Sequence, residues 1–212
     1  MIPLILKLKK NAHKEIAVAQ DLIIQEIVNV FDNAVLHGGT GIWRCYNGNR
    51  FSEDIDIYLR KDIDKIDLFF KNLERKGFTI EKKRIKDNSL YSTVRINGTI
   101  VRVEGLFKRI EGILKEYETI DGNFITIYSL APEELIIEKV ETYLKRLKIR
   151  DLYDIFFLLR YVNDTIKVNH AVKKLIKNFD RPVDEKELKV LILEGLVPDY
   201  GKMLEYIKKW EK

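Results

Sequence analysis

Two short stretches of the sequence combine residue types that can bind a nucleotide and a metal ion. Gly38 and Gly39 follow a short apolar segment, and their lack of side chains allows a tight turn whose backbone N–H groups can face a phosphate. The segment 52–59 alternates polar and apolar residues, so Asp54 and Asp56 share one face of a predicted strand. Two carboxylates beside an anion-binding turn predict a divalent metal site for nucleotide chemistry.

A third carboxylate occurs on a later predicted strand. Residues 99–108 have a period of two, which places Arg102 and Glu104 on the face opposite the apolar positions. Two-metal phosphoryl transfer commonly uses a further acidic residue on a neighbouring strand, and Glu104 is the best-placed candidate. The alternative is that Glu104 is solvated or paired with a neighbour such as Arg102, as a single exposed carboxylate usually is.

Two blocks of residues, taken in order, carry a resemblance to a known family. The first block contains Gly38, Gly39, Thr40, Arg50, Ser52, Asp54 and Asp56. The second contains Glu138 and Lys139, followed by Arg-Asp-Leu-Tyr-Asp at 150–154. With these blocks, which cover most of residues 34–159, the chain resembles the nucleotidyltransferases of the AbiEii/AbiGii toxin family, in the polymerase β-like superfamily.

The resemblance implies the transfer of a nucleoside monophosphate from an NTP, with Mg²⁺ as cofactor and Mn²⁺ as the alternative ion. It implies that Asp54, Asp56 and Glu104 are metal ligands and catalytic residues. The residues implied in nucleotide binding are Gly38, Gly39, Thr40, Arg50, Ser52 and Lys139.

The remaining catalytic candidates come from the second block. Lys139 would contact the triphosphate, and Asp151 and Asp154 would position Lys139, the base or the acceptor. The alternative for these three residues is an ion pair between helices that fixes the domain interface.

Predicted helices and strands position these residues. Residues 12–32 have the apolar spacing of an amphipathic helix, which leads into a strand before Gly38. Thr40 to Tyr46 is expected to form a short helix whose first turn the Thr40 hydroxyl caps. Asp62 can start another helix. Period-two patterns then predict strands at 78–84, 89–96, 99–108, 116–119 and 124–128.

Beyond Pro132 every pattern is helical. The fold class is therefore expected to be α+β. A polymerase β-like nucleotidyltransferase domain with a mixed sheet is predicted at 1–128, and a C-terminal helical domain at 129–212. The nucleotide is expected in the cleft between them.

Composition excludes several classes of protein. The chain is 46% hydrophobic and 33% charged, a balance typical of a globular protein rather than a disordered one. No apolar run is long enough for a transmembrane helix, and the N-terminal segment places its apolar piece before its basic one, the reverse of a secretory signal. Cys45 is the only cysteine, so no internal disulfide can form. We therefore expect no membrane partner and a cytoplasmic location.

Three functions are compatible with these residues. The first, implied by the resemblance, is a toxin of a toxin–antitoxin system that adds a nucleotide to an RNA such as the tRNA 3′ end, with an antitoxin as protein partner. A net charge of +5, with basic clusters such as that at 82–84, permits an RNA acceptor. The second is transfer to a protein or small-molecule hydroxyl. The third is a non-catalytic nucleotide- or RNA-binding module, against which the three intact carboxylates argue.

Overall fold

The computed structural model describes residues 3–211, which form two compact units that divide between Ser129 and Leu130. Residues 1–2 and 212, which belong to the predicted domains, lie outside the described residues. The elements of the first unit are α1 (Leu4–Lys7), α2 (Asn11–Val30), β1 (Val35–His37), α3 (Gly38–Cys45), β2 (Ile55–Leu59), α4 (Ile63–Arg75), β3 (Thr79–Ile85), β4 (Ser89–Ile96), β5 (Thr99–Phe107), β6 (Ile113–Glu118) and β7 (Phe124–Ser129).

The first unit is built on a seven-stranded mixed sheet with the order β3-β4-β5-β2-β1-β7-β6. Strand β2 runs antiparallel to β1 and parallel to β5, while β1 runs parallel to β7. The pairs β3/β4, β4/β5 and β6/β7 are antiparallel. The predicted α+β class with a mixed sheet is thus confirmed. The topology places two strands that are distant in sequence, β2 and β5, at the centre of the sheet.

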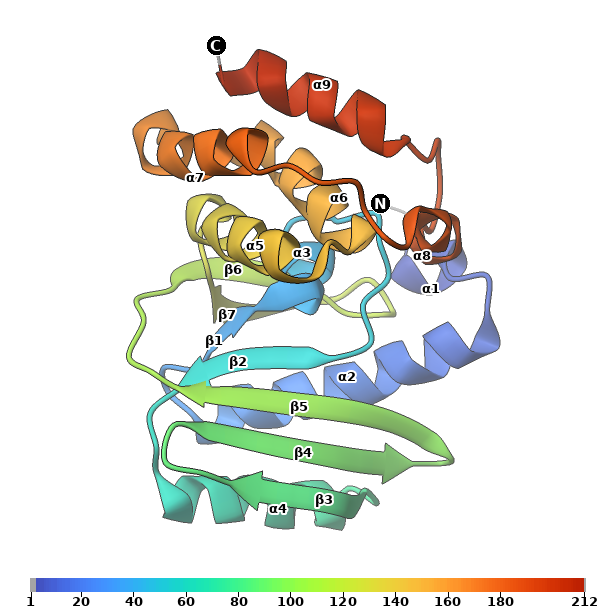
Figure 1. Cartoon of the computed structure of the whole chain (residues 1–212). Coiled ribbons are helices and arrows are strands. Elements are labelled where there is room, and N and C mark those ends of the chain that lie inside the picture. Colours follow the sequence, from blue (N-terminus) through green and yellow to red (C-terminus); the bar gives the residue numbers. More distant parts are fainter. Residues whose placement is uncertain (1–2, 212) are drawn as a thin grey trace. The chain divides into compact units, whose positions relative to one another are not determined.

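Helices α2 and α4 lie on one face of this sheet (Figure 1). The alternation of β2 explains why, because its apolar residues Ile55, Ile57 and Leu59 are all buried on that face. Ile23 of α2 and Phe69 of α4 are also buried. Each such side chain contributes about 1.5–3 kcal/mol when it is removed from water. The polar residues of β2 therefore project from the opposite face of the sheet.

Within residues 130–211, the regular elements of the second unit are all helices. Its elements are α5 (Pro132–Arg146), α6 (Ile149–Leu158), the short 3₁₀ helix η1 (Leu159–Tyr161), α7 (Thr165–Lys177), η2 (Glu185–Glu187), α8 (Leu188–Leu191) and α9 (Tyr200–Glu211). Helix α5 begins with Pro132 in its first turn, as predicted, and is followed by the C-cap residue Leu147, which adopts a left-handed conformation with φ 51°. No helix in the described part of the chain has the length and hydropathy needed to span a membrane.

Two local predictions in the first unit are wrong. Helix α3 begins at Gly38 rather than Thr40, and no side chain caps it. The Thr40 hydroxyl lies inside the helix and donates its hydrogen bond to the backbone carbonyl of Asp54. The second strand begins at Ile55 rather than Ser52. The later start of β2 arises because the segment before it is held by side chains from α2 and α3, a non-local effect that periodicity does not reveal.

Candidate active site

A row of polar side chains crosses the sheet at the level of Asp56. Asp56 on β2 is the register partner of His37 on β1 and of Glu104 on β5. Glu104 is in turn paired with Tyr91 on β4, and Tyr91 with Arg84 on β3. Residues that are direct partners project from the same face of a sheet, so the five form one transverse row on the face opposite α2 and α4. Neighbouring members are about 4.8 Å apart along the row, measured between strands.

Two adjacent members of the row are carboxylates. Partial burial raises the pKa of Glu104 above its ordinary range, and the negative charge of Asp56 raises it further. The positive charge of Arg102 acts in the opposite direction. The pair therefore carries repulsion that a bound cation would relieve.

Asp54, the residue before β2, is held by an arginine. Arg102 of β5 donates a hydrogen bond from Nε to Asp54 Oδ1 at 2.7 Å and another from Nη2 to Asp54 Oδ2. These hydrogen bonds raise the pKa of Arg102. The sequence left open a pairing of Arg102 with Glu104. In the structure, the hydrogen bonds of the Arg102 guanidinium go to Asp54 instead.

The arrangement and chemistry of the three carboxylates bear on their use as a metal site. Within residues 3–211, no group of three His, Cys, Asp or Glu side chains is arranged to hold a metal ion. Because Arg102 occupies both oxygens of Asp54, that carboxylate does not converge with Asp56 and Glu104. Hard oxygen donors that repel one another nevertheless suit Mg²⁺ or Mn²⁺. The three carboxylates fit such an ion if Asp54 releases Arg102 and binds the ion instead.

A glycine turn lies directly beside this row. Gly38 has a φ of +65°, and a Cβ atom there would overlap the carboxylate of Asp56, whose Cγ would be 2.9 Å away. A Cβ atom at Gly39 would be 2.5 Å from Ser52 Oγ and 2.7 Å from Arg50 Nη2. The turn is also the start of α3, where backbone N–H groups lack intrahelical acceptors and the helix dipole is positive. Gly38 therefore requires glycine through its positive φ, whereas a side chain at Gly39 would displace Ser52 and Arg50, and the turn can bind an anion.

Buried polar side chains hold the segment between α3 and β2. Gln20 of α2 is fully buried and donates hydrogen bonds of 3.0 Å to the backbone carbonyls of Ser52 and Glu53. Arg50 is buried and donates to the carbonyl of Phe51 at 2.9 Å. Gln20 was not among the residues predicted from the sequence. The only available signal was an amide among apolar residues on one face of the predicted helix.

Helix α3 is anchored by a buried arginine. The Arg44 guanidinium lies 4.7 Å from the ring centroid of Trp43 and 4.6 Å from that of Tyr117, and it pairs with Asp21 of α2. Tyr117 donates a hydrogen bond of 2.9 Å to the same carboxylate. Stacking and ion pairing together make the orientation of α3, and with it the glycine turn, rigid.

The predicted residues of the second block form a separate cluster in the helical unit. Lys139 Nζ of α5 lies 2.7 Å from Asp154 Oδ2 and 3.4 Å from Asp151 Oδ1, both on α6. Arg146, which was not predicted as a member of this cluster, donates to both oxygens of Asp151 at 2.7 and 2.8 Å. Asp151 and Asp154 are fully buried. The structure thus brings these three residues together and places Asp54, Asp56 and Glu104 with the glycine turn in the other unit.

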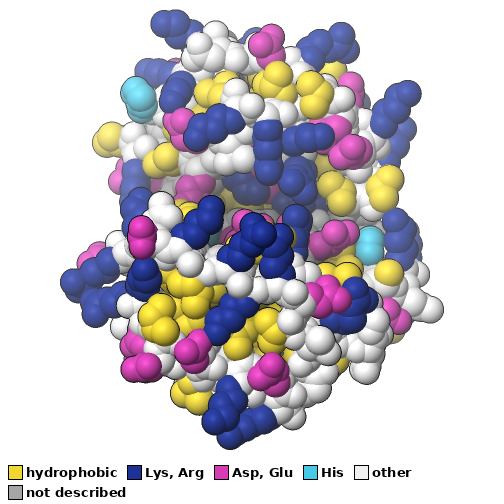
Figure 2. All heavy atoms as spheres, turned by 60° about the horizontal axis from the view of Figure 1, so that its bottom comes forward, with side chains coloured by type: hydrophobic (Ala, Val, Ile, Leu, Met, Phe, Trp, Pro, Cys, Tyr) yellow, Lys and Arg dark blue, Asp and Glu magenta, His cyan; other side chains and the backbone are white. Residues whose placement is uncertain are grey.

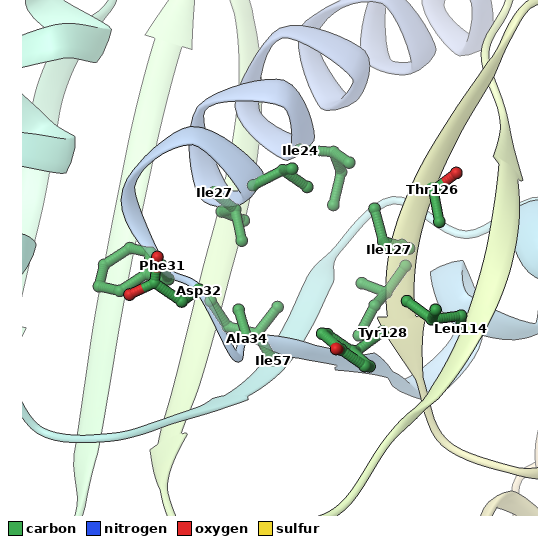
Figure 3. A pocket seen from close by; sticks show the side chains of 12 residues that line it. Ile24, Ile27, Phe31, Asp32, Ala34, Ile57, Leu114, Thr126, Ile127 and Tyr128 are labelled. Atoms are coloured by element: carbon green, nitrogen blue, oxygen red, sulfur yellow. The ribbon is translucent and has the colours of Figure 1, made fainter.

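A cavity of about 590 Å³ lies over the transverse row. Its charged and aromatic lining consists of His37, Asp56, Lys82, Arg84, Lys86, Tyr91 and Glu104. A smaller apolar pocket of about 90 Å³ lies on the opposite face of the sheet, between α2 and strands β1, β2, β6 and β7 (Figure 3). Its one charged residue, Asp32, is paired with Lys65. Of these two cavities, the first contains the carboxylates and basic groups suited to nucleotide chemistry.

Comparisons with known proteins agree with this fold. The family model described as "Nucleotidyl transferase AbiEii toxin, Type IV TA system" matches residues 23–208. The solved structure of JHP933 from Helicobacter pylori is similar with a TM-score of 0.66 and 19% identity, covering 92% of this chain and 90% of that one. MenT4, a nucleotidyltransferase toxin from Mycobacterium tuberculosis, is similar with a TM-score of 0.65 and 18% identity, covering 94% and 87%. No curated protein sequence matches the chain.

Proposed function

Since this chain belongs to the family of AbiEii nucleotidyl transferase toxins of type IV toxin–antitoxin systems, we propose that it transfers a nucleoside monophosphate from an NTP to an RNA, such as the 3′ end of tRNA. Family membership makes the protein a nucleotidyltransferase. The RNA acceptor, the metal dependence and the individual residue roles are parts of the proposal. The observation that carries it is the contact of the glycine turn at Gly38 with Asp56, next to Glu104.

The transfer exchanges a phosphoanhydride bond of the NTP for a phosphodiester bond to the acceptor. An acceptor oxygen forms a bond to the α-phosphorus, the bond between the α-phosphorus and the bridging oxygen breaks, and pyrophosphate leaves. The hydroxyl proton passes to a nearby base. Glu104 is suited to receive it, because its carboxylate lies next to Asp56 in the transverse row. Asp54, Asp56 and Glu104 would hold a divalent metal, which would supply charge neutralisation at the phosphates.

The residues around the turn bind the nucleotide in this proposal. Backbone N–H groups at Gly38 and Gly39 face the phosphates, because the start of α3 is a favourable place for negative charge. The Thr40 hydroxyl donates a hydrogen bond to the backbone carbonyl of Asp54 and so fixes the position of this residue. Arg50 and Ser52 flank Gly39 and add a positive charge and a hydroxyl.

For Lys139, Asp151 and Asp154 we propose the role in nucleotide binding and catalysis that the second block implies. Two buried carboxylates around Lys139 hold its ammonium group in place. The same contacts join α5 to α6, so the cluster also stabilises the helical unit.

A polyanionic acceptor suits the charge of the protein. The net charge is +5, and Lys and Arg side chains are spread widely over the face shown in Figure 2, with Asp and Glu between them. A cytoplasmic location would give access to both NTP and RNA. The family description of a toxin–antitoxin system also supports an antitoxin as protein partner.

The test is a labelling reaction. The protein is incubated with each α-labelled NTP, Mg²⁺ and total tRNA, and Asp56→Asn is compared with the matched control Asp87→Asn, which changes a fully exposed carboxylate in the β3–β4 turn. We expect label on tRNA with wild type and the control, and a loss of at least about 100-fold with Asp56→Asn or after addition of EDTA. Label on protein, or on nothing, contradicts an RNA acceptor.

A further inference from the structure

Three basic side chains project from one face of strand β3 and its continuation. Lys82 is paired with Thr93, and Arg84 with Tyr91, while Lys86 follows two residues later with its backbone N–H bonded to Ser89. All three line the cavity over the transverse row. We refer to Lys82, Arg84 and Lys86 as the basic stripe.

Lys83 lies on the same strand but on the opposite face, and its environment is different. Lys83 is paired with Ser92, faces α4, and lies 4.8 Å from the Phe70 ring centroid and 2.5 Å from the Asp67 carboxylate. Within residues 3–211, none of the three residues of the basic stripe forms a salt bridge. The positive charge of the stripe is thus available to a ligand, whereas that of Lys83 is neutralised within the protein.

The basic stripe and the glycine turn lie on opposite sides of the carboxylates. Along the row, Asp56 has His37 on one side, next to Gly38, and Glu104, Tyr91 and Arg84 on the other. Three strand spacings separate Arg84 from Asp56, about 14 Å. The row is therefore ordered from an anion-binding turn, through two carboxylates, to a basic strand.

This order matters because phosphoryl transfer is an in-line displacement. The attacking oxygen and the leaving oxygen occupy opposite sides of the α-phosphorus. If the leaving pyrophosphate is held at the glycine turn, the acceptor must approach from the side of β5, β4 and β3. The basic stripe lies on that approach.

The length of the stripe indicates the kind of acceptor. From Lys82 to Lys86 the strand advances about 13 Å, at about 3.3 Å per residue. Three cations spread over that distance suit successive phosphates of a polynucleotide better than a single small molecule. Tyr91 stands beside them, partly exposed, with Lys82 Nζ at 4.8 Å from its ring centroid, and an aromatic ring next to a basic track is the usual platform for an unpaired base.

We propose that the basic stripe and Tyr91 bind the backbone and one base of a single-stranded polynucleotide, whose 3′ hydroxyl then reaches Asp56 and Glu104. The inference rests on the proposed function, because it names the surface that recognises the acceptor of the same reaction. It assigns acceptor recognition to β3 and β4, and nucleotide recognition to the turn after β1.

Binding is measured without catalysis. A fluorescein-labelled single-stranded RNA with a free 3′ hydroxyl is titrated with protein in the absence of NTP and metal, over a series of salt concentrations, and anisotropy is recorded. The triple variant K82Q/R84Q/K86Q should bind at least about tenfold more weakly, and the slope of log K against log salt should fall by about 2, since each phosphate contact on a single strand contributes about 0.7.

The control variants separate the stripe from general charge. Lys83→Gln removes one charge from the opposite face of β3 and should leave both affinity and slope unchanged, because Lys83 does not line the cavity. Loss of its surface ion pair with Asp67 should cost little stability. Tyr91→Ala should weaken binding several-fold, whereas Tyr91→Phe, which keeps the ring, should not. Should the triple variant unfold, Lys86→Gln alone tests the same point with a slope change of about 0.7.

Four outcomes would overturn the inference. In the first, wild type does not bind RNA; in the second, the salt slope of the triple variant is unchanged. In the third, duplex RNA binds as tightly as single-stranded RNA and also depends on the stripe. In the fourth, the triple variant loses binding of a fluorescent NTP as much as binding of RNA. The last result would make the stripe a triphosphate site.

The labelling reaction distinguishes failure of this inference from failure of the proposed function. If wild type and triple variant label RNA with the same KM for the acceptor, the inference fails and the function stands. If RNA binds through the stripe but receives no nucleotide, the acceptor part of the proposed function fails.

Discussion

Arg102 donates hydrogen bonds to both carboxylate oxygens of Asp54. An arginine fork matches the geometry of a carboxylate and leaves few lone pairs of Asp54 for any other cation. Because Asp54 is also a proposed metal ligand, guanidinium and metal compete for one group. Arg102 is therefore expected to tune the affinity of the site for its ion.

We predict that Arg102→Gln tightens metal binding. Exposed ion pairs are worth at most about 1 kcal/mol, so the expected gain in Mn²⁺ affinity is up to about fivefold. Isothermal titration calorimetry without nucleotide measures it. Arg95→Gln, which removes an arginine paired with Glu81 elsewhere on the sheet, is the control and should have no effect. Weaker binding by Arg102→Gln would mean that Arg102 orients Asp54 for the ion instead.

Gly38→Ala is predicted to abolish transfer. The added Cβ atom overlaps the Asp56 carboxylate, and the positive φ of this position disfavours any side chain. Gly77→Ala is the matched control, because Gly77 also has a positive φ of 90° but no atom within 4 Å of the added Cβ. Both variants should lose stability through backbone strain in thermal unfolding. Only Gly38→Ala should lose more than about 100-fold in labelling, and equal losses would refute a specific role for the turn.

Glu104→Gln is predicted to change the pH dependence of stability. Burial and the charge of Asp56 raise the pKa of Glu104 in the folded state, so its ionised form opposes folding. This cost is absent at pH values below the ordinary glutamate pKa and fully present above the raised one. Wild type should lose stability relative to Glu104→Gln as pH rises through that interval. Urea unfolding of both proteins from pH 4 to pH 8 measures the difference, and parallel curves would contradict the prediction.

Lys139→Met is predicted to destabilise the protein. The change leaves Asp151 and Asp154 buried without their shared ammonium group, and removing one partner of a buried ion pair costs about 3–5 kcal/mol. Lys145→Met on the same helix, at an exposed position, is the control and should change the free energy of unfolding by less than about 0.5 kcal/mol. If Lys139→Met is stable but inactive, the role of Lys139 is catalytic alone.

Cys45 is predicted to be unreactive in the folded protein. Burial raises the pKa of its thiol to about 12, so the nucleophilic thiolate is absent at neutral pH. Iodoacetamide at pH 8 should modify Cys45 at least about 100-fold faster in denaturing urea than in buffer, as followed by mass spectrometry. Rapid labelling in buffer would show that α3 opens readily.

Local patterns were sufficient for most of the elements. The period of two placed β3, β4 and β5, and the turn at Asn97 and Gly98, both with positive φ, joins the last two strands as predicted. The opposite orientations of Val103 and Glu104 also followed from alternation, and burial confirms them. The polymerase β-like fold is confirmed by the solved structures that share it.

The contacts between distant segments could not be predicted in the same way. The pairing of Asp56 with Glu104 depends on β5 inserting beside β2, which is set by the packing of the whole sheet. Arg102 could have paired with either Glu104 or Asp54, and only the register decides between them. Gln20 lies far from Ser52 in sequence and contacts its carbonyl. The roles of the site residues remain predictions that the variants above test.

Strand β3 forms one edge of the sheet and contains none of the proposed metal ligands. Outward-facing positions on an edge strand can change without repacking the interior, because only one neighbouring strand depends on them. Substitutions there could redirect the protein to a different acceptor while Asp56, Glu104 and the glycine turn stay as they are. Related toxins could thus diverge in target through a single strand and retain a common reaction.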